Sequence, residues 1–162
     1  MLWEWTKWLT WFGDHRVVLS LAGLLTVLAW RSRRPLALGG FSGVFVTLVL
    51  TRLIKDLVAR ARPVEVLDGL HAIGGGLSHS FPSGHVAGFT ALAVVAGFHW
   101  PRHRVLWWGL SVGMVWTRLY LGRHFPSDCV AGMFLGALVS FGVIWLFDQI
   151  GKRRSGAEPI ST

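Results

Sequence analysis

Five long apolar runs constrain this chain more than any other feature of its sequence. They cover Val17–Trp30, Leu36–Ile54, Gly84–Trp100, Val105–Leu121 and Cys129–Phe147, and charged residues are almost absent inside them. A helix that crosses a membrane needs about 20 mostly apolar residues. The first run has only fourteen, but the arginines at its two ends can lay their aliphatic stems along lipid and keep their charges in water. The runs therefore predict an all-α integral membrane bundle with about five transmembrane helices.

The two ends of the chain differ from this pattern. Residues 1–13 (MLWEWTKWLTWFG) place large apolar side chains at helical spacing, with Glu4 and Lys7 among them. This predicts an amphipathic helix that lies at the membrane interface, although a path across the membrane stays open. Residues 14–150 are expected to form one membrane domain. The polar segment 151–162 (GKRRSGAEPIST) is expected to be a disordered cytoplasmic tail.

The positive charge of the chain limits the classes of partner that we expect. The formal net charge is +8, which in a soluble domain would suggest nucleic acid. Here the cations lie between apolar runs, as topology signals and lipid-contacting residues do. The expected partner at this point is the bilayer, with no nucleic acid and no obligate protein partner. The single cysteine, Cys129, excludes an intrachain disulfide and a cysteine metal cluster.

A first polar motif, KDLVARARP, follows the second apolar run. Lys55 and Arg62 are seven residues apart, so on one continuous helix they would share a face, and Pro63 would end that helix. Arg52 extends the same stripe, whereas Arg60 would point elsewhere as a solvated charge. The pattern is typical of an anion-binding face, but also of cations at the end of a membrane helix.

A second motif, Pro82-Ser83-Gly84-His85, opens the third run. Proline suits the first turn of a helix, and the free amides that follow it attract an anion. Gly84 lets an oxygen approach the backbone closely. The motif therefore predicts an anion site with His85 beside it, although an ordinary helix start with an interfacial histidine has the same pattern.

A third motif, TRLYLGRHFPSD, links the last two runs. Asp128 would lie in the first turn of the last helix, where the helix dipole stabilises a carboxylate. It can accept a hydrogen bond from one imidazole nitrogen of His124 and leave the other nitrogen free to attack. Arg118 would add a cation. A loop histidine and a helix cap are the alternatives for His124 and Asp128.

Alternation of five spans places all three motifs on one face of the membrane. The other face receives the basic stretches 31–35, 101–104 and 152–154. The two faces carry equal numbers of lysines and arginines. When Lys55, Arg62 and Arg118 are set aside as ligand-binding residues, the face opposite the motifs has more. The positive-inside rule then predicts that the motifs face outward, in a multi-pass protein of the bacterial cytoplasmic (inner) membrane.

The order K-x6-RP, PSGH and R-x5-H-x3-D resembles the type 2 phosphatidic acid phosphatase (PAP2) superfamily, from Lys55 to Asp128 and, with the helical framework, to about Phe147. Two departures are that Thr117 stands where a serine is usual, and that membrane members commonly have six spans. The resemblance implies a metal-independent phosphatase without a cofactor. It also implies roles for eight residues: His124 as nucleophile, Asp128 as the residue that orients His124, His85 as general acid and then base, and Lys55, Arg62, Ser83, Gly84 and Arg118 as phosphate ligands. The Ser83 and Gly84 amides would join the Ser83 hydroxyl in that cradle.

The resemblance further implies a lipid substrate, with hydrolysis of a phosphomonoester or diphosphate through a phosphohistidine. Undecaprenyl diphosphate, phosphatidylglycerol phosphate and phosphatidic acid are the expected head groups. A lipid A phosphatase, a lipid-to-lipid phosphotransferase and a non-catalytic protein that binds anionic lipid stay open. The glycine-containing segment Val64–Phe81 is expected to cover the site as a mobile lid. The roles of its His71 and His79 stay open too.

Overall fold

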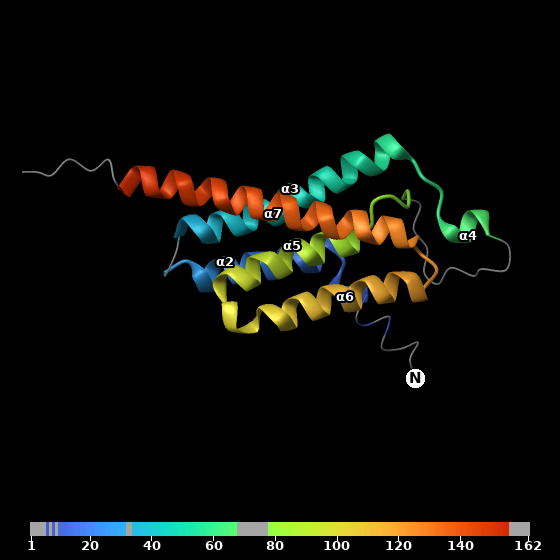
Figure 1. Cartoon of the computed structure of the whole chain (residues 1–162), viewed down its shortest axis with the longest axis horizontal. Coiled ribbons are helices and arrows are strands. Elements are labelled where there is room, and N and C mark those ends of the chain that lie inside the picture. Colours follow the sequence, from blue (N-terminus) through green and yellow to red (C-terminus); the bar gives the residue numbers. More distant parts are fainter. Residues whose placement is uncertain (1–5, 7, 9, 32–33, 68–77, 156–162) are drawn as a thin grey trace, which may run out of the picture.

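Five long helices make up most of the part of the chain that the structure describes (Figure 1). The structure is a computed structural model, and it describes residues 6, 8, 10–31, 34–67 and 78–155. The long helices are α2 (His15–Ala29), α3 (Arg34–Val58), α5 (Gly84–His99), α6 (Arg104–Tyr120) and α7 (Pro126–Ser155). Two short elements, α4 (Pro63–Val66) and the 3-10 helix η1 (Pro101–His103), lie between them. The described residues contain no strand, which confirms the all-α prediction.

Each long helix covers one of the five predicted apolar runs, and the helix ends have local causes. Asp14 caps α2, because its Oδ1 accepts a hydrogen bond from the amide of Arg16 at 2.9 Å. Pro126 begins α7, where a missing amide proton costs nothing. α7 continues to Ser155, five residues into the segment predicted as a disordered tail, and 156–162 lie outside the described residues. In the N-terminal segment, residues 6, 8 and 10–12 are helical, as expected.

The first motif does not lie on one helix, and this prediction was wrong. α3 ends at Val58, and Ala59 follows with a φ of +47°, a left-handed conformation that ends a helix. Residues 59–62 are not helical, and Pro63 begins α4 instead of ending α3. Lys55 and Arg62 therefore come from different elements.

α5 is the central helix of the bundle. It packs against α2, α3, α6 and α7, and every residue from Val86 to Ala96 is buried. Many of these residues are small, whereas large apolar side chains lie on the outside, with Phe45 51% exposed, Phe134 66% and Trp145 64%. Soluble monomers rarely expose so much contiguous apolar surface. α3 and α7 are long and apolar enough to cross a membrane, and the number of crossings stays a prediction.

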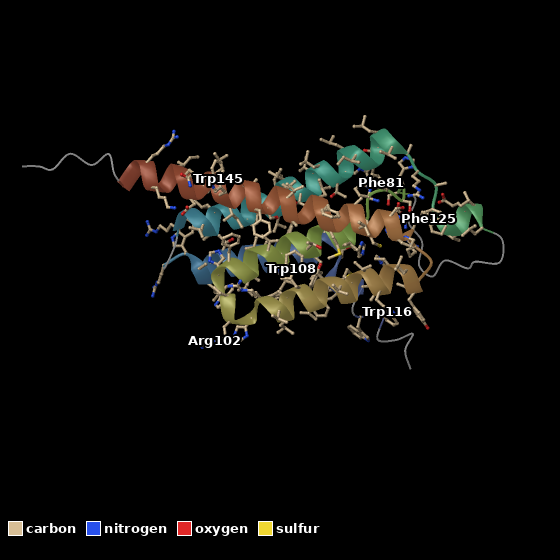
Figure 2. The ribbon with its side chains drawn as sticks, viewed as in Figure 1. Phe81, Arg102, Trp108, Trp116, Phe125 and Trp145 are labelled. Carbon is tan, nitrogen blue, oxygen red and sulfur yellow. The ribbon has the colours of Figure 1, made fainter. Side chains whose placement is uncertain are left out.

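The three motifs meet at one end of the bundle. α3 and α6 reach this end with their C-termini, and α5 and α7 begin there (Figure 1). Figure 2 shows Phe81 of the second motif and Phe125 of the third at this end, while Arg102 lies toward the opposite end. The predicted clustering of the motifs on one side of the fold agrees with this arrangement.

Glycines let α7 approach α5 closely enough to define this end of the bundle. A Cβ atom at Gly132 would lie 2.7 Å from the carbonyl oxygen of Ser83, and one at Gly136 would clash with the carbonyl oxygen of Ala87. Backbone atoms cannot move aside as a flexible side chain can. Close contact through small residues is a common way for membrane helices to pack.

We expect Gly136→Ala to destabilise the protein, because the added methyl group would force α5 and α7 apart. The expected loss is about 1–3 kcal/mol, the usual cost of overpacking. Gly142→Ala, on the same helix, is the matched control, since a Cβ there meets nothing within 4 Å and alanine favours a helix more than glycine does. Thermal unfolding in detergent measures both, and equal midpoints for the two variants would contradict the close-packing argument.

Candidate active site

The cations of the first motif hold the loop that precedes the second. The Nζ of Lys55 donates to the carbonyl oxygen of His79 at 2.5 Å and lies 3.4 Å from that of Ser80. The guanidinium of Arg62 donates to Ser78, from Nε to the carbonyl oxygen at 2.8 Å and from Nη2 to the hydroxyl at 3.0 Å. Its Nη1 reaches the carbonyl oxygen of Arg123 at 3.2 Å. Lys55 and Arg62 are only 8% and 6% exposed, so both cations face inward despite coming from different elements.

The second motif contains the start of α5, as predicted, but Pro82 precedes the N-cap residue, so its predicted place in the first turn was wrong. Ser83 is the N-cap residue, and its carbonyl oxygen accepts from the amide of Ala87, the first bond of the helix. The amides of residues 84–86 are then left without an acceptor inside the helix. The Ser83 hydroxyl is buried and makes no hydrogen bond within the described part of the chain. Gly84 lies against α3, because a Cβ there would contact Thr51 and Lys55.

One detail of the second motif differs from the expectation. The Ser83 amide donates to the backbone carbonyl oxygen of Asp128 at 3.0 Å. It is therefore not free for a bound anion, and the prediction that it joins the anion cradle was wrong. The bond joins the start of α5 to the start of α7 instead.

The third motif brings its carboxylate beside its histidine. Oδ2 of Asp128 lies 3.5 Å from Nδ1 of His124, and the Ser80 hydroxyl lies 3.4 Å from the same nitrogen. Ser80 donates its hydroxyl proton to Oδ2 of Asp128 at 2.5 Å. Toward Nδ1 of His124, the Ser80 oxygen and the Asp128 carboxylate can therefore both act only as acceptors. Nδ1 therefore carries the imidazole proton, and Nε2 keeps a free lone pair.

His85 and Arg118 both face the N-terminal segment. A Cβ atom on Gly13 would lie 2.9 Å from Cδ2 of His85, which shows how closely this segment covers the imidazole. Nη2 of Arg118 donates to the Thr10 hydroxyl at 3.2 Å, while its Nε is buried without a hydrogen-bond partner among the described residues. The N-terminal segment is therefore part of the wall of the site.

The charges of Lys55, Arg62 and Arg118 all act on the imidazole of His124, so these residues form one site. The pKa of His124 falls to about 4, chiefly because burial disfavours its protonated form. The hydrogen bond to Asp128 raises this pKa, and the charges of Lys55, Arg62 and Arg118 lower it again. His124 is therefore neutral at pH 7. The three cations act on this one imidazole, and Asp128 is the only carboxylate among the buried residues that the structure describes. Such a positive, buried site favours an anionic ligand.

Several contacts were missed by the sequence analysis. Arg60 was predicted to be a solvated charge, but its Nη1 forms an ion pair with Oδ1 of Asp128 at 2.7 Å. That prediction was wrong because it assumed a continuous helix through Arg60. Ser78, Ser80, Thr10 and Gly13 had no recognisable signal, since their roles depend on where separate segments meet. Arg52 pairs with Asp56 at 3.2 Å on the surface, and His71 and the glycines 74–76 lie outside the described residues.

A cavity of about 430 Å³ opens beside Lys55 and His85. Its lining combines apolar residues of α2 and α3, namely Leu19, Phe45, Leu48 and Val49, with polar residues, namely His15, Thr51, Arg52, Lys55, Ser78 and His85. A lining of both kinds fits a ligand that carries an anionic group on a hydrocarbon chain.

Comparison with known proteins places the chain near lipid phosphatases. The sequence profile of the PAP2 superfamily matches residues 36–152. The chain is 33% identical over 150 residues to the decaprenylphosphoryl-5-phosphoribose phosphatase of Mycobacterium tuberculosis, covering 90% of this chain and 78% of that protein. It is 34% identical over 116 residues to the lipid A 1-phosphatase of Rhizobium johnstonii, covering 68% of this chain but 47% of that protein. The chain thus spans about half the length of the latter relative.

A solved structure has the same fold. The transmembrane PAP2-type phosphatidylglycerolphosphate phosphatase of Bacillus subtilis superimposes with a TM-score of 0.78. The match covers 91% of this chain and 77% of that one, at 24% sequence identity. The shared fold agrees with the all-helical bundle of the described residues.

We expect the imidazole of His124 to stay mostly neutral down to about pH 5, because burial and three nearby cations oppose its protonation. An unfolded chain would protonate this histidine near pH 6.5. Between the two pKa values the unfolded state binds more protons, so this group makes the fold less stable as the pH falls from about 6.5 to about 4. Histidine nitrogen NMR of the ligand-free protein, assigned with His124→Gln, measures the midpoint. A midpoint near 6.5 would contradict the burial argument.

Proposed function

Because the chain belongs to the PAP2 superfamily, we propose that it is a membrane phosphatase that releases phosphate from a lipid-linked phosphomonoester or diphosphate. The observation that carries the proposal is the neutral imidazole of His124, buried beside three inward-facing cations. Cations held in a water-poor pocket stabilise the charge that spreads over a transferring phosphoryl group. The same arrangement keeps the nucleophile unprotonated.

The proposed reaction has two halves. In the first, the Nε2 lone pair of His124 attacks phosphorus, the bond from phosphorus to the lipid oxygen breaks, and His85, which enters the step as the imidazolium, gives one proton to that oxygen. In the second, a water molecule gives a proton to His85 and attacks phosphorus, and the phosphorus–nitrogen bond breaks to release phosphate. Asp128 orients His124 throughout. No step of this proposal requires a metal ion or a cofactor.

Phosphate ligands are proposed from the geometry of the site. Lys55, Arg62 and Arg118 supply the positive charge, and the unpaired Nε of Arg118 and the Ser83 hydroxyl are donors that a phosphate oxygen would satisfy. The amides at the start of α5, including that of Gly84, add the positive end of the helix dipole. Lys55 and Arg62 would keep part of their bonds to the Ser78–Ser80 loop.

The substrate class follows from the cavity. Its apolar lining residues on α2 and α3 would contact the first part of an acyl or prenyl chain, and Lys55 and His85, which also line it, would meet the phosphate. Undecaprenyl diphosphate, phosphatidylglycerol phosphate and phosphatidic acid are the proposed substrates. The decaprenyl-linked substrate named for the mycobacterial relative favours testing polyprenyl lipids first. Lipid A is the alternative that the Rhizobium relative supports, and transfer to an acceptor lipid is the alternative reaction.

We propose that the site faces outward from the bacterial cytoplasmic membrane. The opposite end of the bundle carries exposed basic residues, including Arg34, Arg102, Arg104 and Arg153. Positive charge of this kind favours the cytoplasmic side. The substrates would then be lipids exposed on the outer leaflet.

We expect His124→Ala to lower the rate of phosphate release about a thousandfold or more, because the variant lacks the imidazole that accepts the phosphoryl group in the proposed reaction. His103→Ala is the matched control, since His103 is exposed in η1 at the opposite end of the bundle and should have wild-type activity. Free phosphate is measured with purified protein and a panel of lipid phosphates in the presence of EDTA. Full activity in His124→Ala would contradict the role of His124 as nucleophile, and activity that returns only with added metal would contradict the metal-free reaction.

The same assay separates the alternative functions. Phosphate recovered on an acceptor lipid would indicate a phosphotransferase, and lipid binding without turnover would indicate a non-catalytic protein.

The orientation gives a separate prediction. A cysteine in place of Val66, which is 57% exposed in α4 at the motif end, should react with a membrane-impermeant maleimide added to intact spheroplasts. A cysteine in place of Arg102 should react only after the membrane is opened, because it lies toward the opposite end (Figure 2). The native Cys129 is buried and should give little background. The reverse labelling pattern would place the site in the cytoplasm.

A further inference from the structure

We infer that Arg60 is a positioning residue of the site: its guanidinium holds the Asp128 carboxylate in the orientation that presents Oδ2 to His124. The inference rests on the proposed function only for its effect on catalysis. Its structural part concerns the contacts of Arg60, Asp128 and His124 themselves.

Arg60 is held from three sides. Its Nη1 lies 2.7 Å from Oδ1 of Asp128 and 2.8 Å from the hydroxyl of Ser127. Its Cζ lies 4.2 Å from the centre of the Phe125 ring, within the range of a cation–π contact. Phe125 and Ser127 both lie between His124 and Asp128 in the chain. Arg60 therefore contacts three residues of the turn that follows the proposed nucleophile.

The backbone around Arg60 explains why it reaches α7. α3 ends before it, and the left-handed Ala59, with a φ of +47°, redirects the chain. A non-glycine residue in this region is strained and persists where its surroundings require it. The carbonyl oxygen of Arg60 then accepts from the amide of Ser80 at 2.8 Å. Ser80 in turn donates to Asp128, so Arg60, Ser80 and Asp128 form a closed set of contacts.

The two oxygens of Asp128 have separate partners. Oδ1 accepts from Arg60, while Oδ2 accepts from the Ser80 hydroxyl and from the Phe125 amide at 2.9 Å and faces His124. A buried carboxylate can rotate about its own axis unless both oxygens are held. With Arg60 on Oδ1, rotation would break a 2.7 Å ion pair in which the carboxylate is 0% exposed and the guanidinium is half-buried, which is costly. Because the two oxygens of a carboxylate are equivalent, Arg60 fixes the plane in which the carboxylate meets the imidazole of His124.

The guanidinium suits this task better than an ammonium group would. It spreads its donors in a plane, so Nη1 serves both Asp128 and Ser127 while the plane rests on the ring of Phe125. A lysine at this position would restore the charge but lose the planar contact with the ring. Arginine and lysine variants therefore separate charge from orientation.

The test compares Arg60→Gln, Arg60→Lys and wild type as purified full-length protein in detergent. Lys152→Gln is the matched control. It too removes the cation of an ion pair with an aspartate, because Nζ of Lys152 lies 2.6 Å from Asp148 in the distant part of α7. Two readouts are used: kcat and KM for phosphate release, and two-bond nitrogen–proton NMR spectra of His124, assigned with His124→Gln. The NMR spectra show which imidazole nitrogen carries the proton, a property that a purely structural role would leave unchanged.

We expect Arg60→Gln to lower kcat by roughly ten- to a hundredfold with KM within about threefold, as a small misplacement of a reacting group does. The His124 spectrum should change from the tautomer protonated at Nδ1 to a mixture of the two tautomers. Arg60→Lys should recover part of both effects, and Lys152→Gln should match wild type.

The inference is overturned if Arg60→Gln keeps the wild-type His124 spectrum, whether kcat is unchanged or falls together with the melting temperature. If Arg60→Gln does not fold, Phe125→Leu removes the ring beneath the guanidinium and leaves both charges; it should shift the spectrum in the same direction, and an unchanged spectrum would overturn the inference. If wild type releases no phosphate from any lipid, the proposed function fails, while the spectra still decide the role of Arg60.

Discussion

The buried carboxylate of Asp128 is the interaction on which the site depends. A carboxylate without exposure to water is unfavourable unless donors surround it. Here the donors come from three separate stretches: Arg60 after α3, Ser80 before α5, and the Phe125 amide before α7. Satisfying one buried charge therefore forces three chain segments to meet at one end of the bundle. His124 lies 3.5 Å from the same carboxylate, so the interaction that joins these segments also positions its imidazole.

The helices that deliver these segments pack through their smallest residues. The buried face of α5 is rich in alanine, and Gly132 and Gly136 of α7 lie directly against its backbone. Large apolar side chains such as Phe134 and Trp145 are left on the outside. In a bilayer this arrangement costs little, because lipid solvates the large side chains and close backbone contact supplies the packing energy. The start of α5 and the start of α7 can then be joined by a single backbone hydrogen bond, from Ser83 to Asp128.

The electrostatics of the site follow from this geometry. Lys55, Arg62 and Arg118 are buried, and Asp128, which Arg60 already pairs, is the one buried carboxylate in the described part of the chain. This leaves a positive pocket and a neutral imidazole. Both conditions suit attack by His124 on a phosphoryl group, since the anion is attracted and the lone pair stays free. Apolar residues of α2 and α3 line a cavity together with Lys55 and His85, which fits an anionic group carried on a hydrocarbon chain. The N-terminal segment completes the enclosure through Thr10 and Gly13.

The sequence by itself determined the all-α architecture, the position of five helices and the superfamily, because apolar runs and short polar motifs are local properties of the chain. It also indicated His124 beside Asp128, since a spacing of four residues across a helix start leaves few other arrangements. Only the tertiary structure decided that α3 ends at Val58, that Arg60 pairs with Asp128, and that the Ser83 amide is already bonded. These features depend on a left-handed residue at Ala59 and on contacts between segments far apart in sequence. A helical repeat carries no information about where the helix stops or about which distant donors a buried carboxylate will find.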